Sequence, residues 1–260
     1  MPVADGNKAP LWGFFIFLRE AYNVHMKKHI FFDLDNTLTR SRSPITPNMA
    51  KLLRALSKHH DVLVVSGADA KQIATQLGQS VRGKYWSMGQ NGNACITPTG
   101  ETLWERKMDW LQKYEVFAYA HKLFSAKLFP HKDKLDLLQD RGCQLSYSFI
   151  GHHADVANKE KFDPDHKKRL MVLKKFPFKS KTVEVKIAGT TCFDFFIKGK
   201  HKGANIAELC TTMKWKKSEC LYVGDALFKN GNDESVIGVI PTKAVRDPSE
   251  TERVIQEILG

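Results

Sequence analysis

The chain has 260 residues, which suits one large domain or two modest ones. Hydrophobic residues make up 42% of it and charged residues 26%, which are ordinary proportions for a soluble globular protein. No apolar run approaches the ~20 residues of a membrane span, so we expect no membrane partner. The net charge of +12 would suit nucleic acid, but the lysines are scattered and no nucleic-acid motif is present. We therefore expect no nucleic-acid partner, and the same charge would also attract a phosphorylated small molecule.

Cysteine usage bears on the cell compartment. The cysteines are odd in number and form no Cys-x-x-Cys pair, which argues against a zinc site or a disulfide framework. Such usage is typical of a reducing compartment, so we expect a cytoplasmic protein. The five are Cys95, Cys143, Cys192, Cys210 and Cys220.

Residues 1–26 precede the first clear strand. The segment 11–18 is apolar enough to suggest a signal sequence, but only Lys8 precedes it and no small-x-small cleavage site follows. Met26 begins a short basic segment that leads directly into the strand. We hypothesise that Met26 is the true initiator or that residues 1–25 are appended, so that 1–26 is an N-terminal extension.

One short stretch organises the chain. Residues 30–32 read Ile-Phe-Phe, which predicts the end of a fully buried strand in a parallel sheet. Asp33 and Asp35 follow at its carboxyl end, where ligands bind in open α/β folds. Two crowded carboxylates repel unless a cation joins them, and Mg²⁺ suits oxygen ligands. The alternative is a turn in which Asp35 and Asn36 bond local backbone amides, and the apolar lead-in favours the metal site.

Further helices and strands alternate along the chain. Apolar periodicity and capping residues indicate the helices, and short β-rich runs indicate the strands. We expect helices at 44–58, 69–77, 110–124, 164–173 and 204–211, and one opened by a capping box at 249–252. We expect strands at 61–65, 85–88, 144–150, 182–187, 193–196, 220–223 and 237–240, and a hairpin around 98–100.

Polar residues stand where several of these elements end or begin. Ser66 follows a buried strand, and its hydroxyl could bond a phosphoryl oxygen. Lys202 starts a helix, and Asp225 follows a second buried strand, with Asp233 further on. A loop serine or a solvated lysine would explain each residue alone. Their order after the acidic pair is what points to phosphate chemistry.

The pattern of residue types changes between about residues 102 and 194. Long amphipathic stretches mix with aromatic residues and lysines, and no strand there ends in an acidic motif. We predict an α/β fold in which a Rossmann-like core with a parallel sheet, residues 27–101 and 195–260, carries an inserted α/β cap, residues 102–194. The site would lie in the cleft between them.

The polar residues resemble the motifs of the haloacid dehalogenase (HAD) superfamily. Asp33, Asp35 and Thr37 match its first motif, Asp-x-Asp-x-Thr, and Ser66 and Lys202 match the second and third. The resemblance implies that Asp33 is a nucleophile that becomes an aspartyl phosphate. It implies that Asp35 is the general acid and base. Ser66 and Lys202 would stabilise charge on the transferring group.

The fourth motif of that superfamily binds the metal. Asp225 and Asp233 match it, with glycines nearby that let the backbone approach a cation. The resemblance implies a Mg²⁺ cofactor held by Asp33, by the backbone carbonyl of Asp35 and by Asp225. Asp233 would lie nearby.

An insert between the second and third motifs resembles subfamily IIB of the superfamily. Within it the chain is most similar to the eukaryotic-type phosphomannomutases, over most of residues 28–259. The matching segments are 33–39 with Arg42, 90–92, 145–151, 193–195, 224–225 and 231–234.

The chain departs from that family where arginines grip the phosphate that is not transferred. A guanidinium binds phosphate with a planar fork, which lysine and histidine cannot copy. A mutase must hold a bisphosphate while it reorients, whereas a phosphatase only admits water. The departures therefore favour hydrolysis. Arg42 and Arg141 match two of the four arginines, His152 and Lys159 stand at the other two positions, Cys192 replaces a sugar-binding serine, and Asp194 is retained.

We therefore predict a Mg²⁺-dependent phosphatase that acts on a small phosphorylated metabolite, in particular a sugar phosphate. The first alternative is a phosphomannomutase-like phosphotransferase that interconverts mannose 6-phosphate and mannose 1-phosphate. The second is a catalytically silent anion-binding protein, which would have no need of the intact acidic residues and Lys202. A homodimer is left open.

Overall fold

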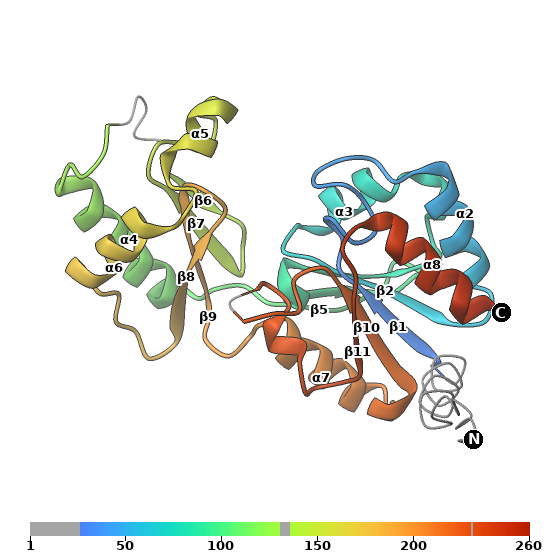
Figure 1. Ribbon diagram of the computed structural model, residues 1–260. Helices are drawn as coiled ribbons and strands as arrows, with labels where there is room; N and C mark the ends of the chain where they lie inside the picture. The colour runs from blue at the N-terminus through green and yellow to red at the C-terminus, as the bar shows by residue number, and fades with distance from the viewer. Residues whose placement is uncertain (1–26, 131–135, 230) are drawn as a thin grey trace, which may run out of the picture.

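The computed structural model describes residues 27–130, 136–229 and 231–260. The predicted N-terminal extension, residues 1–26, lies outside the described residues. Within the described ranges, no helix combines the length and the apolar character needed to cross a membrane. Figure 1 shows two groups of elements, each built around its own sheet. The predicted fold class, an α/β protein with a central parallel sheet and a second sheet, is confirmed.

A seven-stranded sheet forms the larger group. Strands β11, β10, β1, β2 and β3 are parallel, and β4 and β5 continue the sheet as antiparallel strands at one edge. The order across the sheet is β11-β10-β1-β2-β3-β4-β5. The bounds are β1 His29–Phe32, β2 Asp61–Val65, β3 Trp86–Gly89, β4 Ala94–Ile96, β5 Thr102–Glu105, β10 Cys220–Gly224 and β11 Thr242–Ala244.

Strand β1 lies at the centre of this sheet because both of its faces are apolar. Ile30 and Phe32 pack in one cluster with helices α2 and α8, and Phe31 packs on the opposite face with α7. All three side chains are fully buried, and each burial contributes about 1.5–3 kcal/mol. The strand is therefore firmly anchored up to Asp33. The helices are α2 Pro47–Leu56, α3 Ala70–Leu77, α7 Lys202–Thr212 and α8 Pro248–Leu259.

A four-stranded antiparallel sheet, in the order β6-β7-β9-β8, forms the smaller group. One face is apolar and packs in a cluster with helices α4 and α6. Since side chains alternate along a strand, the opposite face carries polar residues such as Asp194 and Lys186. The bounds are α4 Trp110–Ser125, β6 Leu138–Asp140, β7 Gln144–Ser148, α5 Val156–Phe162, α6 Lys167–Lys175, β8 Val183–Ala188 and β9 Cys192–Ile197.

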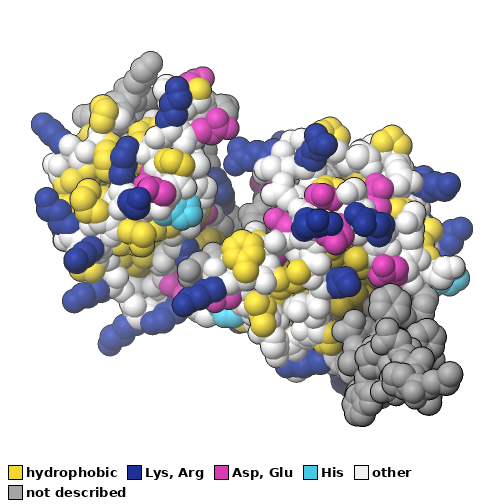
Figure 2. Space-filling model, viewed as in Figure 1, with side chains coloured by type: hydrophobic (Ala, Val, Ile, Leu, Met, Phe, Trp, Pro, Cys, Tyr) yellow, Lys and Arg dark blue, Asp and Glu magenta, His cyan; other side chains and the backbone are white. Residues whose placement is uncertain are grey.

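Basic side chains are dispersed over the molecule. Figure 2 shows lysine and arginine side chains over the visible face of both groups, with acidic side chains among them. This arrangement is what scattered lysines in the sequence indicated.

Helix α2 lies within the predicted range 44–58 and α3 within 69–77, and a polar side chain caps the start of each. The side chain of Thr46 accepts a hydrogen bond from the backbone amide of Met49 at the start of α2, and Asp69 does the same for Gln72 in α3. Both predicted helices are confirmed. Helix α3 ends at Leu77, and the backbone oxygen of Gln76 in its last turn accepts a hydrogen bond from the amide of Ile45, in the segment that follows β1.

The predictions near the C-terminus were partly wrong. The segment 237–240 is not a strand, and β11 lies at Thr242–Ala244 instead. The 3-10 helix Glu234–Val236 ends just before that segment, a turn that includes Gly238 (φ 81°) follows it, and Ile240 is apolar because it packs in the core. Helix α8 begins at Pro248 rather than at a capping box from residue 249, because Asp247 accepts hydrogen bonds from the amides of residues 249 and 250.

Sheet membership differs from the predicted domain limits by a few residues. Strand β5 belongs to the seven-stranded sheet because it pairs with β4 in a hairpin. Strand β9 pairs along its whole length with β7 and β8, so residues 195–197 belong to the second sheet. We therefore propose a core of residues 27–105 and 198–260 and a cap of residues 106–197. Strand β6 and helix α5 were not predicted.

A buried ion pair ties the cap together. The side chains of Arg169 in α6 and Asp163 are both fully buried, with Nε and Oδ2 2.7 Å apart. Arg169 Nη1 also donates to the backbone carbonyls of Ala188 and Cys192, at 2.7 and 3.0 Å. These contacts join helix α6 to the turn between β8 and β9.

We predict that Arg169→Met destabilises the protein by about 3–5 kcal/mol, because removing one partner leaves a buried carboxylate without compensation. Urea unfolding followed by circular dichroism would measure the change in the free energy of unfolding. Lys174→Met, on the exposed side of the same helix, is the matched control and should change little. A similar small change for both variants would contradict this role of the pair.

Candidate active site

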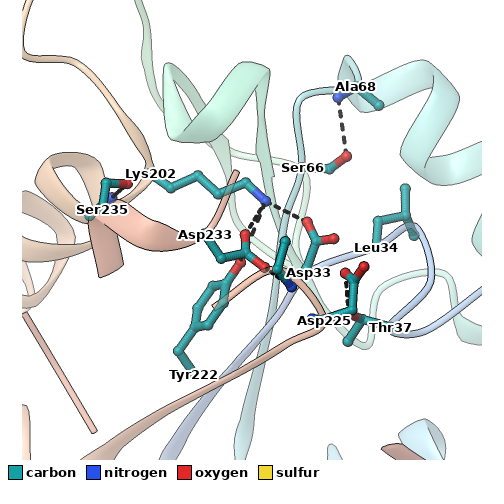
Figure 3. Close-up of polar contacts among 12 residues, drawn as sticks. Asp33, Leu34, Thr37, Ser66, Ala68, Lys202, Tyr222, Asp225, Asp233 and Ser235 are labelled. Atoms are coloured by element: carbon teal, nitrogen blue, oxygen red, sulfur yellow. Dashed lines mark hydrogen bonds and ion pairs between the residues drawn. The ribbon is translucent and has the colours of Figure 1, made fainter. Parts of the chain in front are cut away.

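The carboxyl ends of three neighbouring strands carry the predicted polar residues. Strand β1 lies between β2 and β10 in parallel register, so the residues that follow them meet at one edge of the sheet. Asp33 follows β1, Ser66 follows β2 and Asp225 follows β10. The structure therefore brings these three predicted residues together (Figure 3).

Lys202 is held between two carboxylates. It is the first residue of α7, and its Nζ lies 2.5 Å from Asp33 Oδ1 and 2.7 Å from Asp233 Oδ1 (Figure 3). The hydroxyl of Tyr222 donates to the same Asp233 oxygen at 2.7 Å. All four side chains are almost completely buried. A cation fixed in this way faces the place where Asp33 would bond to phosphorus.

Close approach at this edge requires a glycine. A Cβ atom at Gly224 would lie 2.4 Å from Asp233 Oδ2 and 2.7 Å from the Tyr222 ring. Any larger residue would push Asp233 away from Lys202. Gly224 of the fourth motif thus leaves room for Asp233 and Tyr222, and the approach of its backbone to a cation stays a prediction.

Three carboxylates could hold a cation. Asp33, Asp225 and Asp233 each offer an oxygen, and these atoms all lie within 4.8 Å of one another. Thr37 Oγ1 lies 3.2 Å from Asp225 Oδ1 and fixes its orientation (Figure 3). Three negative groups against one ammonium leave excess negative charge, and a donor set of carboxylate oxygens suits Mg²⁺. The chemistry of the donor set therefore fits the predicted metal.

The pKa values of these groups reflect the excess of negative charge at the site. Burial raises the pKa of Asp33 to about 7 although Lys202 opposes the rise, and Asp233 and Asp225 raise it further. Burial, followed by repulsion from Asp233, also raises the pKa of Asp225. Burial alone would lower the pKa of Lys202, but Asp33 and Asp233 outweigh it and raise that pKa. An additional cation would favour the ionised Asp33 that a nucleophile requires.

A cleft of about 830 Å³ opens above these groups, between the two sheets. From the core it is lined by Asp33, Asp35, Arg42, Ser66 and Lys202, among others, and from the cap by Arg141, Gln144, Lys186 and Asp194. The predicted residues Arg42, Arg141 and Asp194 thus reach the cleft together with the catalytic candidates. Asp225 and Asp233 lie behind the lining, in the acidic cluster.

Three other predicted substrate contacts are not brought to this lining. His152 Nε2 lies 2.9 Å from the backbone oxygen of Ser146, and Lys159 Nζ donates to the backbone oxygen of His152 at 2.5 Å. Cys192 Sγ contacts Thr191 Oγ1 at 3.4 Å. The chain bends at residues 149 and 150 after β7, and beyond that bend His152 and Lys159 contact backbone oxygens of the cap. Their predicted role in substrate binding stays a prediction.

Sequence analysis missed Lys186 and Gln144. Lys186 in β8 pairs directly with Asp194 in β9, so the two side chains lie on the same face of the sheet. Gln144 Nε2 donates to Asp194 Oδ2 at 2.7 Å, and Ser146 donates to its other oxygen at 2.5 Å. Only its pairing with Asp194, which the structure shows, distinguishes Lys186 from the many other lysines of the chain.

Comparison with known proteins identifies the family. A sequence profile of the haloacid dehalogenase-like hydrolases matches residues 30–237. The chain therefore belongs to this family and is an enzyme of the HAD superfamily.

The chain is also similar to phosphomannomutases. It is 27% identical over 237 residues to the phosphomannomutase of Spinacia oleracea, covering 87% of this chain and 94% of that protein. It is 24% identical over 268 residues to the phosphomannomutase of Saccharomyces cerevisiae, covering 92% and 97%. Within the superfamily the chain is thus phosphomannomutase-like and of subfamily IIB type, as its motifs predicted.

Solved structures share the fold. A haloacid dehalogenase-like hydrolase from Bacteroides thetaiotaomicron matches with a TM-score of 0.64 at 14% identity, covering 89% of this chain and 99% of that one. The IMP-nucleotidase of Plasmodium falciparum matches with a TM-score of 0.65 at 15% identity, covering 91% and 64%. At these identities the likeness shows the fold alone.

The donor set predicts that Asp225→Asn weakens Mg²⁺ binding by at least the about 10–100-fold that loss of an outer-shell partner costs, because the variant loses a charged ligand. Isothermal titration calorimetry of the metal-free protein with MgCl₂ and no substrate would measure the affinity. Asp247→Asn is the control, since it removes an exposed carboxylate at the start of α8 and keeps a capping side chain. Unchanged Mg²⁺ affinity in Asp225→Asn would contradict the assignment.

Proposed function

We propose that the protein is a Mg²⁺-dependent phosphatase that hydrolyses a small phosphorylated metabolite, in particular a sugar phosphate. The observation that supports this most is the contact of Lys202 with Asp33 at the base of a cleft that the cap also lines. An ammonium at this place positions the Asp33 carboxylate and offsets the charge of an incoming phosphate.

The reaction has two steps. First, an Asp33 oxygen forms a bond to phosphorus while the bond from phosphorus to the sugar oxygen breaks, and Asp35 gives that oxygen a proton. Water then gives a proton to Asp35 and attacks the aspartyl phosphate, which releases phosphate and restores Asp33. Ser66 and Lys202 stabilise the charge on the transferring group in both steps.

Asp33, Asp225 and the backbone carbonyl of Asp35 would hold Mg²⁺. When bound, the ion would neutralise charge on the phosphoryl oxygens. Asp233 lies beside them and could add an oxygen to the ion, while its Oδ1 atom accepts hydrogen bonds from Lys202 and Tyr222. It fixes the ammonium of Lys202 toward Asp33.

The end of the cleft that would hold the phosphate that is not transferred supports hydrolysis of a sugar phosphate over a mutase reaction, in which the phosphate moves between two positions of the sugar. Arg42 and Arg141 are the two guanidinium groups of the predicted grip that line it, and Lys186 adds a point charge. A mutase has to hold a second phosphate firmly while the intermediate turns, and a lysine lacks the planar fork for this. A phosphatase needs only moderate binding at this end.

A phosphomannomutase-like phosphotransferase is the second candidate. Similarity to phosphomannomutases over most of the chain favours it, and so does the presence of Arg42, Arg141 and Asp194 in the cleft. A catalytically silent anion-binding protein is a weaker candidate, since a complete set of Asp33, Lys202 and acidic neighbours has no purpose there.

We infer that the partner is a small phosphorylated molecule and that no nucleic acid is bound. The cleft volume of about 830 Å³ is in the usual range for small-molecule sites and supports this. We also infer a cytoplasmic location, which the five free cysteines support.

Phosphorus NMR of mannose 1-phosphate with enzyme, Mg²⁺ and a hexose bisphosphate activator would separate the two candidates. We expect free phosphate to accumulate, with little mannose 6-phosphate. Asp33→Asn is the control and should form neither product, because an amide cannot attack phosphorus. Mannose 6-phosphate that appears faster than free phosphate would overturn the phosphatase and establish the mutase.

A further inference from the structure

The carboxylate of Asp35 is held on one side only. Its Oδ1 atom accepts a hydrogen bond from the backbone amide of Arg42 at 2.7 Å and another from Gln76 Nε2 at 3.1 Å. In the described part of the chain no donor reaches its Oδ2 atom. Because Asp35 also lines the cleft, this second oxygen is the one left for a substrate.

Gln76 is a polar residue at a buried position. It lies in the last turn of α3 on the same buried face as Ile73 and Leu77, and only 5% of its surface is exposed. A buried amide costs free energy unless its hydrogen bonds are satisfied. Packing of the helix alone would be served better by an apolar side chain, so the contacts of Gln76 require another explanation.

The contacts of Gln76 converge on the loop that carries Asp35. Its Nε2 also lies 3.1 Å from Thr39 Oγ1, and its backbone oxygen accepts a hydrogen bond from Ile45 at 2.7 Å. Its Oε1 accepts from Gln72 Nε2 at 3.3 Å, which sets the orientation of the amide. With Nε2 directed at both Asp35 and Thr39, Gln76 fixes the loop and the carboxylate at once.

We propose that Gln76 is a positioning residue for Asp35. It holds one carboxylate oxygen so that the other faces the leaving oxygen of the bound phosphate ester. This inference rests on the proposed function, in which Asp35 protonates that oxygen. Catalytic groups must be placed closely, since a displacement of about 1 Å costs on the order of 100-fold in rate.

The test compares two substrates that differ in their need for a proton. The leaving oxygen of glucose 6-phosphate is an alkoxide that requires a proton, whereas 4-nitrophenyl phosphate releases a stable phenolate that does not. The parameter is kcat/KM, which includes only the steps up to departure of the leaving group. Later hydrolysis of the phosphoenzyme, which uses Asp35 for both substrates, therefore does not affect the comparison.

We expect Gln76→Leu to lower kcat/KM for glucose 6-phosphate by about 10–100-fold, mainly through kcat, and to lower it much less for 4-nitrophenyl phosphate. Gln76→Glu is a second variant that keeps the length of the side chain and replaces the donor by an acceptor. It should show the same difference between substrates. Thr75→Ala, at an exposed position next to Gln76 in α3, is the matched control and should change neither value.

Equal losses for the two substrates, or no loss, would overturn this inference, because a purely structural role of Gln76 does not depend on the leaving group. That result would leave the proposed function intact, since the wild-type enzyme would still release phosphate. Wild-type protein that releases phosphate from neither substrate would overturn the proposed function and this inference with it.

Discussion

The site depends on one buried contact, the ammonium of Lys202 between the carboxylates of Asp33 and Asp233. Charges at such depth are costly to remove from water, and pairing repays that cost only when the geometry is good. The geometry here requires that the end of β1, the start of α7 and the loop after β10 meet within hydrogen-bond distance. The parallel order of β10, β1 and β2 provides that meeting place, and Gly224 provides the space. Fold and chemistry are thus linked by the same few contacts.

Much of the core could be predicted because its signals are local. The continuous apolar runs of β1, β2 and β10 are typical of strands buried on both faces. The capping residues Thr46 and Asp69 mark two helix starts. The segment 237–240 misled the prediction because Val239 and Ile240 pack in the core from a turn rather than from a strand. The two sheets divide a few residues away from the predicted cap limits because pairing partners are not visible in the sequence.

Some residues of the candidate site were likewise indicated by local sequence motifs, and others were not. Asp33, Asp35 and Lys202 could be found because their motifs stand at element ends. Lys186 could not, because only its place opposite Asp194 separates it from other lysines. Gln76 looks like an ordinary helix residue until its contacts with the loop after β1 are seen. A residue whose proposed role depends on its position opposite another side chain, or on a hydrogen bond to one, can be identified only from the structure.

Trapping a covalent bond between Asp33 and phosphorus is the most direct experiment on the proposed mechanism. Enzyme turning over 4-nitrophenyl phosphate would be quenched in acid, digested and analysed by mass spectrometry. We expect one added phosphoryl group on the peptide that contains Asp33. Asp35→Asn should contain more of it, because hydrolysis of the aspartyl phosphate needs that carboxylate as a base. A phosphoryl group on another residue, or turnover with unmodified Asp33 in both proteins, would contradict nucleophilic attack by Asp33.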